Sequence, residues 1–217
     1  MPFQYITVIF VLEIIGTIAF ASAGAMVAIR KNMDIFGVMV LGITNAVGGG
    51  CIRDLILGIH PPKMFHDFSY VGTAIVISCL LFVLFYCKKH LLEGRFIESY
   101  EKAMNVFDAI GLGIFTITGI RTAIMVSENS GLFLMIFVGV VTGVGGGVIR
   151  DVMAGITPFI FVKHVYACAS LIGAIFYVFL YKRMDDAIAM IISMTAIIGI
   201  RLLAAHYRWN LPRIIKY

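Results

Sequence analysis

Seven apolar stretches, each long enough or nearly long enough to cross a bilayer, run through the 217-residue chain. A helix that crosses about 30 Å of hydrocarbon needs roughly 20 predominantly apolar residues. The chain is 61% hydrophobic and 13% charged, whereas soluble domains carry about 25% charged residues. This composition excludes a secreted disulfide scaffold, a disordered tail and a nucleic-acid-binding domain. We predict an all-α polytopic membrane protein with seven transmembrane helices at residues 5–29, 35–59, 68–87, 104–126, 131–156, 161–181 and 187–205.

A ten-residue motif occurs twice. Residues 45–54 read NAVGGGCIRD and residues 142–151, at an offset of 97, read TGVGGGVIRD. Glu13 and Asp108 also match, at an offset of 95. Each copy lies in a group of three predicted crossings, and an odd number of crossings forces the second group to enter the membrane from the opposite side. We therefore expect two inverted three-helix repeats, with the glycine motifs facing each other near mid-membrane, plus a seventh helix.

The predicted organisation is one membrane domain, 1–217. It contains repeat 1 at about 5–87, a charged linker at about 88–102, repeat 2 at about 104–181, helix 7 at about 185–205 and a tail at 206–217.

Basic residues outside the two Arg-Asp motifs predict the orientation. The N-terminal side carries four, namely Lys63, Arg121, Lys182 and Arg183. The other side carries eleven, namely Arg30, Lys31, Lys88, Lys89, Arg95, Lys102, Lys163, Arg201, Arg208, Arg213 and Lys216. By the positive-inside rule the N-terminus lies outside and the C-terminus is cytoplasmic, in the cell (inner) membrane.

The glycine runs predict two interrupted helices. Each glycine costs about 1 kcal/mol relative to alanine inside a helix, and unwound backbone at membrane depth is tolerated only in protein or beside a water-filled cavity. Freed carbonyl groups and the negative end of a half-helix would suit a cation. We predict an ion path lined by residues of both motifs: Thr44, Asn45, Gly48, Gly49, Gly50, Arg53, Asp54, Thr142, Gly145, Gly146, Gly147, Arg150 and Asp151. The alternative is that the glycines only let neighbouring helices pack closely.

The charges of the motifs are costly inside a membrane, at roughly 3 kcal/mol each. We expect Arg53 and Asp54, and likewise Arg150 and Asp151, to be paired. Lining of a pore and a purely structural salt bridge both remain open.

Four further features have simple expectations. Glu13 and Asp108 are candidates for a wet vestibule, or else lie near the membrane surface. Arg121 and Arg201 are expected to snorkel to the interface. Asp185 and Asp186 are expected to cap the last helix. The histidines and cysteines show no metal-ligand spacing, and no catalytic motif is present, so we expect neither a metal site nor an enzyme.

The duplicated motif resembles that of the trimeric intracellular cation (TRIC) channels, specifically their prokaryotic branch. The resemblance covers two three-helix repeats, a seventh helix and both glycine motifs. It implies a homotrimer with one hourglass pore per protomer, formed around the second and fifth helices and conducting monovalent cations, chiefly potassium. It implies no cofactor beyond permeant K⁺ or Na⁺, with bound lipid at the subunit boundaries and the bilayer as surroundings.

The resemblance has limits that keep other functions open. The Lys-Glu-Val signature of the animal channels is absent, so their regulation is not carried over. Some prokaryotic relatives are associated with glycine uptake, which keeps a carrier for a small amino acid as the alternative to a channel. A membrane scaffold without transport is the third hypothesis.

Overall fold

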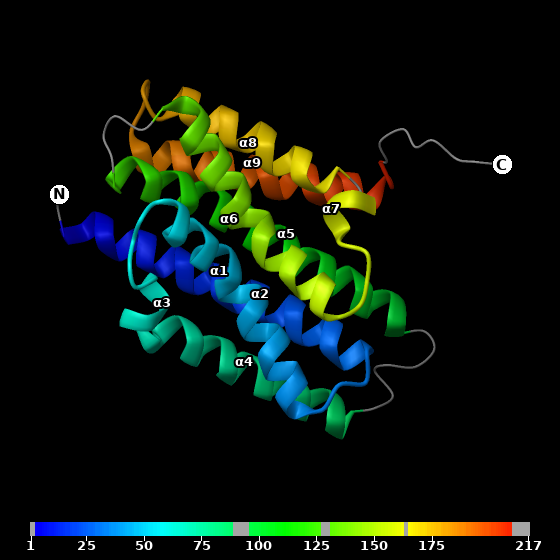
Figure 1. Cartoon of the computed structure of the whole chain (residues 1–217). Helices are drawn as coiled ribbons and strands as arrows, with labels where there is room; N and C mark the ends of the chain where they lie inside the picture. Colours follow the sequence, from blue (N-terminus) through cyan, green and yellow to red (C-terminus); the bar gives the residue numbers. More distant parts are fainter. Residues whose placement is uncertain (1–2, 89–95, 127–130, 163–164, 210–217) are drawn as a thin grey trace.

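The computed structural model describes residues 3–88, 96–126, 131–162 and 165–209, and every regular element in these ranges is a helix. The nine helices of the described residues are α1 (Phe3–Arg30), α2 (Ile35–Ile56), α3 (Lys63–His66), α4 (Phe68–Cys87), α5 (Phe96–Val126), α6 (Leu132–Met153), α7 (Phe159–Val162), α8 (Tyr166–Leu180) and α9 (Asp186–His206). The long helices lie side by side in one bundle (Figure 1).

Six of these helices are long and apolar enough to cross a membrane, at Thr7–Arg30, Ile35–Ile56, Phe68–Cys87, Glu98–Val126, Leu132–Met153 and Asp186–His206. The stretch predicted as a single helix at 161–181 is instead divided between the short α7 and α8. Helix α8 has 15 residues, which corresponds to about 22 Å of rise. The chain is therefore a multi-pass membrane protein, with α8 shorter than a typical span.

Helix α5 begins eight residues earlier than the predicted 104, so part of the predicted linker is helical. Contacts at its first turns explain the difference. The Tyr100 hydroxyl donates to the carbonyl oxygen of Met26, and Arg30 pairs with Glu101 at 2.6 Å. These contacts dock the start of α5 against the end of α1. Residues 89–95 of the predicted linker and 210–217 of the predicted tail lie outside the described residues.

The bundle contains two groups of three long helices. We call α1, α2 and α4 the first half, and α5, α6 and α8 the second half; within each, every helix contacts the other two. The halves meet through α2 against α6 and α1 against α5, while α9 packs on α5 and α8. In Figure 1, α4 lies at one side of the bundle and α8 and α9 at the other, with α3 and α7 at opposite ends.

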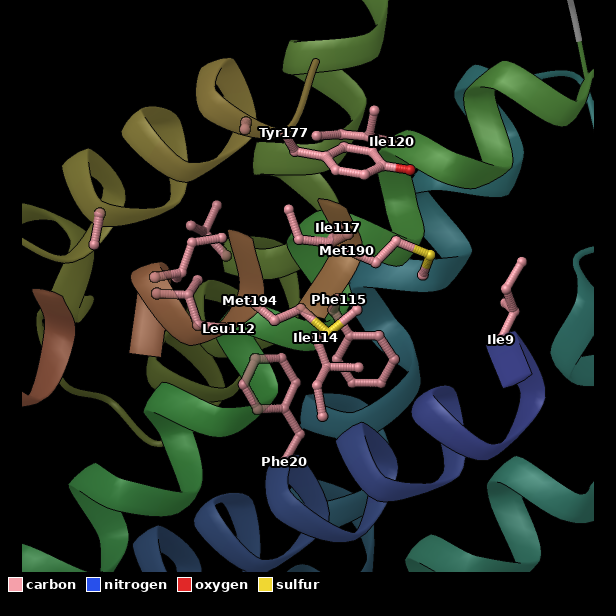
Figure 2. Packing of buried hydrophobic residues seen from close by; sticks show 14 of the residues in the cluster. Ile9, Phe20, Leu112, Ile114, Phe115, Ile117, Ile120, Tyr177, Met190 and Met194 are labelled. Atoms are coloured by element: carbon pink, nitrogen blue, oxygen red, sulfur yellow. The ribbon is translucent and has the colours of Figure 1, made fainter. Parts of the chain in front are cut away.

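The contact between α1 and α5 is built from matching residues. The rings of Phe20 and Phe115, which are related by the 95-residue offset, lie 5.2 Å apart, and Figure 2 shows them next to Leu112 and Ile114. A Cβ atom at Gly16 would lie 3.1 Å from Phe115, and one at Gly111 would overlap the Phe20 ring. Each phenylalanine thus packs over the glycine of the other helix.

Aspartates begin three of the long helices. Asp34 accepts from the amide of Gly37 at α2, and Asp185 accepts from Ala187 and Ile188 at α9. The cap expected from Asp185 is confirmed. Asp67 caps α4, and hydrogen bonds from the hydroxyl and amide of Ser69 hold the pKa of Asp67 below its ordinary value.

Asp186 has another role than the predicted cap. Its carboxylate lies 2.9 Å from Arg121 Nε of α5 and accepts from the Tyr177 hydroxyl of α8 at 2.6 Å. Arg121 is therefore held in an ion pair that joins α5, α8 and the start of α9.

Candidate functional site

Both tri-glycine segments are α-helical. Helix α2 passes through Gly48–Gly50, and α6 through Gly145–Gly147, without interruption. The prediction that these helices unwind is therefore wrong. The carbonyl groups of the glycines stay in the helical pattern, so they are not freed to line an ion path in this conformation.

Close packing of backbones explains why glycines occupy these positions. A Cβ atom at Gly49 would overlap the carbonyl oxygen of Thr142, and one at Gly146 would overlap that of Asn45. Positions 49 and 146, like 45 and 142, are related by the 97-residue offset, so the contact is reciprocal. The alternative interpretation, close approach of helices through small residues, is confirmed for this α2–α6 contact.

The predicted threonine hydroxyls near the glycines have partners, and so does the amide nitrogen of Asn45. Thr44 donates to the carbonyl of Val40 at 2.7 Å, and Thr142 donates to that of Val138 at 2.6 Å. The Asn45 amide donates to the carbonyl of Phe20 at 2.5 Å and so joins α2 to α1. The two hydroxyl hydrogens are therefore used within their own helices.

The first half contains a buried network around Arg53. Its Nε lies 2.8 Å from Asp54 Oδ1, and its Nη1 lies 3.2 Å from Glu13 Oε1 on α1. The hydroxyl of Tyr70 on α4 donates to the other oxygen of Glu13 at 2.7 Å. Arg53 is 4% exposed, Asp54 1% and Glu13 4%. The expected Arg-Asp pairing is confirmed within this half, and Glu13 is buried inside the protein.

The second half repeats this network around Arg150. Its Nε lies 2.8 Å from Asp151 Oδ1, and its Nη1 lies 2.8 Å from Asp108 Oδ1 on α5. The guanidinium carbon is 5.1 Å from the centre of the Phe159 ring. Arg150 is completely buried, and Asp108 is 1% exposed. Each arginine therefore joins its own helix to the first helix of its half.

Each motif aspartate also fastens a short helix. Asp54 Oδ2 accepts from the amide of Lys63, the first residue of α3, at 2.8 Å. Asp151 Oδ2 accepts from the amide of Phe159, the first residue of α7, at 2.9 Å. The chain between these points turns at Gly58 and Gly155, with φ of +71° and +64°, where a residue with a side chain would be strained. The Arg-Asp pairs thus have a clear structural role.

A cavity of about 30 Å³ lies beside the network of the first half. Its lining includes four predicted site residues, Glu13, Gly50, Arg53 and Asp54. The remaining lining residues are Thr17, Ala46, Val47, Cys51, Lys63, Met64, Tyr70 and Phe115. This volume is large enough for a water molecule, and charged side chains line it. The other predicted residues, including Asp108 and all of the second motif, are not among its lining.

Several of the residues that matter here were not singled out from the sequence. Tyr70 and Tyr166 match at an offset of 96, as do Lys63 and Phe159, and this continuation of the repeat was the signal that could have found them. Arg201 was expected to snorkel, but it is 1% exposed and its guanidinium lies 4.8 Å from the centre of the Tyr166 ring. That prediction is wrong because α9 packs with Arg201 facing the bundle.

Comparison with known proteins matches both halves separately. The model of the family described as "Glycine transporter" matches residues 10–86 and 105–182. The UPF0126 inner membrane protein YadS of Escherichia coli is 35% identical over 200 residues, which cover 92% of this chain and 92% of that protein.

Solved structures share the whole architecture. A TRIC cation channel structure is 36% identical with a TM-score of 0.81, covering 100% of this chain and 99% of its own. The structure of the TRIC orthologue from Rhodobacter sphaeroides is 31% identical with a TM-score of 0.82. The match covers 94% of this chain and 100% of that chain. Similarity of this extent, over nearly the full length of chains that have the same helical arrangement, shows that the protein belongs to the TRIC family, among its prokaryotic members.

Proposed function

We propose that the chain is a cation channel, and more specifically a potassium-permeable homotrimer with one pore in each protomer. The observation that carries the proposal is the buried charge beside the first-half cavity. Glu13 and Asp54 together carry two negative charges, against one positive charge on Arg53. A negatively charged, poorly solvated cavity attracts cations and repels anions. Membership in a family whose solved members are named cation channels supports the same conclusion.

Lys63 also lines this cavity, but water screens its charge more than that of the buried Arg53. It is only partly buried, and among the described residues it forms no ion pair with Glu13 or Asp54. Its long side chain can keep the ammonium group in water while the stem covers the cavity. We assign Lys63 to the outer edge of the ion path.

We propose that the two halves are inverted repeats, with α8 as a short span and α9 as the seventh helix of a single membrane domain. The reciprocal contacts of Gly49 and Gly146 support a two-fold relation, and so do α3 and α7 at opposite ends of the bundle (Figure 1). With the N-terminus outside, as the basic residues suggest, the first-half cavity lies toward the outer face and α7 toward the cytoplasm.

The intact helices change the predicted route of the ion. Gly49 and Gly146 leave no room even for a Cβ atom at the α2–α6 contact. A path between these helices therefore requires them to separate, and we assign the described conformation to a closed state. The site residues of both motifs become the proposed walls of the path once α2 and α6 move apart.

A planar-bilayer recording under a potassium chloride gradient tests the proposal. Purified protein should give a reversal potential near that of potassium. Glu13→Gln should reduce the preference for potassium over chloride several-fold, whereas Asp108→Asn in the second half serves as the matched control and should change it less. No current from folded trimer, or an anion-selective reversal potential, would contradict a cation channel.

A glycine carrier is the second candidate, favoured by the description of the matching family. It predicts saturable uptake of radiolabelled glycine into proteoliposomes, which unlabelled glycine competes away. Current without such uptake supports the cation channel. Uptake without current supports the glycine carrier instead.

A further inference from the structure

The second half contains buried polar atoms that the structure leaves without a hydrogen-bond partner. Among the described residues, Asp108 Oδ2, Arg150 Nη2 and Tyr166 Oη have none, and neither does Asn45 Oδ1 from α2 of the first half. Each of these four residues is exposed by 3% or less. Buried polar groups are nearly always paired, with protein or with ordered water. Four unpaired atoms in one region therefore call for an occupant.

Three of these atoms surround the missing side chain of Gly147. A Cβ atom at Gly147 would lie 3.3 Å from Tyr166 Oη, 3.7 Å from Arg150 Nη2 and 4.0 Å from Asn45 Oδ1. The carboxylate of Asp108 adjoins the same group, because its other oxygen accepts from Arg150 at 2.8 Å. The absence of a side chain at Gly147 thus keeps carbon atoms away from this group of polar atoms.

The first half shows why these atoms are left unpaired. Glu13 is one methylene longer than Asp108, and its two oxygens reach both Arg53 and Tyr70. The shorter Asp108 accepts from Arg150 at 2.8 Å and lies near the Tyr166 hydroxyl, but the two do not form a hydrogen bond of normal geometry. At the matching Gly50, a Cβ atom would meet only Arg53 Nη2, at 3.8 Å.

The donors and acceptors identify the occupant. Arg150 Nη2 can only donate, Asp108 Oδ2 and Asn45 Oδ1 can only accept, and the Tyr166 hydroxyl can do either. An anion would be repelled by Asp108, and a bare cation would lie against the Arg150 guanidinium. Water accepts and donates at once, and buried waters make about three hydrogen bonds.

We propose that one water molecule binds over Gly147 and links Asn45 of the first half to Asp108, Arg150 and Tyr166 of the second. It fills in the second half the gap that the longer Glu13 closes in the first half. The site does not depend on ion conduction, so its test is separate from that of the channel.

A high-resolution map of the wild-type protein and of Asp108→Glu tests the site directly. The wild type should show a single peak about 3 Å from the four atoms. Asp108→Glu should lose the peak, since its carboxylate then reaches Tyr166 as Glu13 reaches Tyr70. An empty site in the wild type overturns the proposal, and so does a peak that gains anomalous signal when potassium is replaced by rubidium.

Melting temperatures in detergent give a second test. Gly147→Ala in a Tyr166→Phe background avoids the close contact with the hydroxyl but still displaces the water. We expect it to lower the melting temperature of that background by about 3–8 °C. The matched control, Gly50→Ala in a Tyr70→Phe background, should leave it unchanged or raise it, because alanine favours a helix. If adding Gly147→Ala to Tyr166→Phe leaves the melting temperature unchanged or raises it, no water is displaced.

Discussion

Arg53 and Arg150 have matching partners but different surroundings. Arg53 lies beside a cavity that is lined by Thr17, Cys51 and Lys63. The matching positions of the second half hold Leu112, Val148 and Phe159, and Phe159 lies under the Arg150 guanidinium. Duplication has thus kept the ion pairs while the surrounding residues diverged, so that one arginine adjoins a cavity and the other lies against the Phe159 ring.

Helix α9 accounts for much of this difference. It packs on α5 and α8 and places Arg201 over Tyr166. In the first half, α4 has only Ala74 and Ser78 buried. The added helix covers the second half, and the first half has no such cover within the described chain. The comparison teaches that the shared network joins helices in both halves, while the cavity on which we base the proposed cation channel lies beside the network of the first.

The largest expected effect is a loss of stability that differs between substitutions of Arg150 and Arg53. Arg150→Met leaves Asp108 and Asp151 buried without their cation and should lower the free energy of unfolding by about 3–5 kcal/mol. Arg53→Met should cost about 1–2 kcal/mol less, because water in the cavity can solvate Glu13 and Asp54. Unfolding by SDS titration measures both. Equal losses would show that the cavity makes no difference to the buried charges.

At the contact between Gly49 and Gly146, in contrast to the two arginines, we expect equal losses of stability in the two halves. Gly49→Ala and Gly146→Ala each force a Cβ atom against a backbone carbonyl, and each should destabilise the protein by about 1–3 kcal/mol. Gly50→Ala, which meets no backbone, is the control. A loss at only one of the two positions in the same titration would break the proposed two-fold relation.

Arg201 tests the role of α9. Arg201→Met removes a buried guanidinium from the face of Tyr166 and should cost about 2 kcal/mol. Arg201→Lys keeps the charge and should cost less. We expect Cys51 in the first half to react with a thiol reagent at the same rate in all three proteins. A change in that rate would mean that α9 also shapes the first-half cavity.

The smallest effect concerns the helix starts. Asp34 caps α2, but the matching position at α6 is Gly131, which has no side-chain cap. Both residues have extended backbone, so Gly131→Asp should add a few tenths of a kcal/mol. Asp34→Gly should lose a similar amount. A melting-temperature comparison in detergent checks the pair, and a loss of stability in Gly131→Asp would contradict the match between these positions.

Much of this arrangement could be predicted from the sequence because the repeat acts as an internal alignment. The offset that relates Glu13 to Asp108 predicted which carboxylates share a place in the fold. Intramembrane arginines next to aspartates predicted ion pairs, since unpaired charges are too costly in lipid. The positions of the long helices followed from their apolar length.

The continuity of α2 and α6 could not be predicted in the same way. A glycine run lowers helix propensity and also permits close packing, and the two effects have opposite consequences for the backbone. Only the position of Thr142 and Asn45 across the contact decides between them. Arg201 is a similar case, since its side chain points inward or outward according to how α9 packs, and the apolar pattern of α9 does not fix this.

The mutual contact of Gly49 and Gly146 also bears on how such a chain arose. Each half offers the other the same surface, so an ancestral three-helix protein could have paired with a copy of itself before the genes fused. In the inverted arrangement proposed above, the two copies would insert upside down relative to each other. An ancestor with a nearly even distribution of basic residues would do so, and fusion followed by an accumulation of lysine and arginine on one face would then have given the modern chain a single direction of insertion.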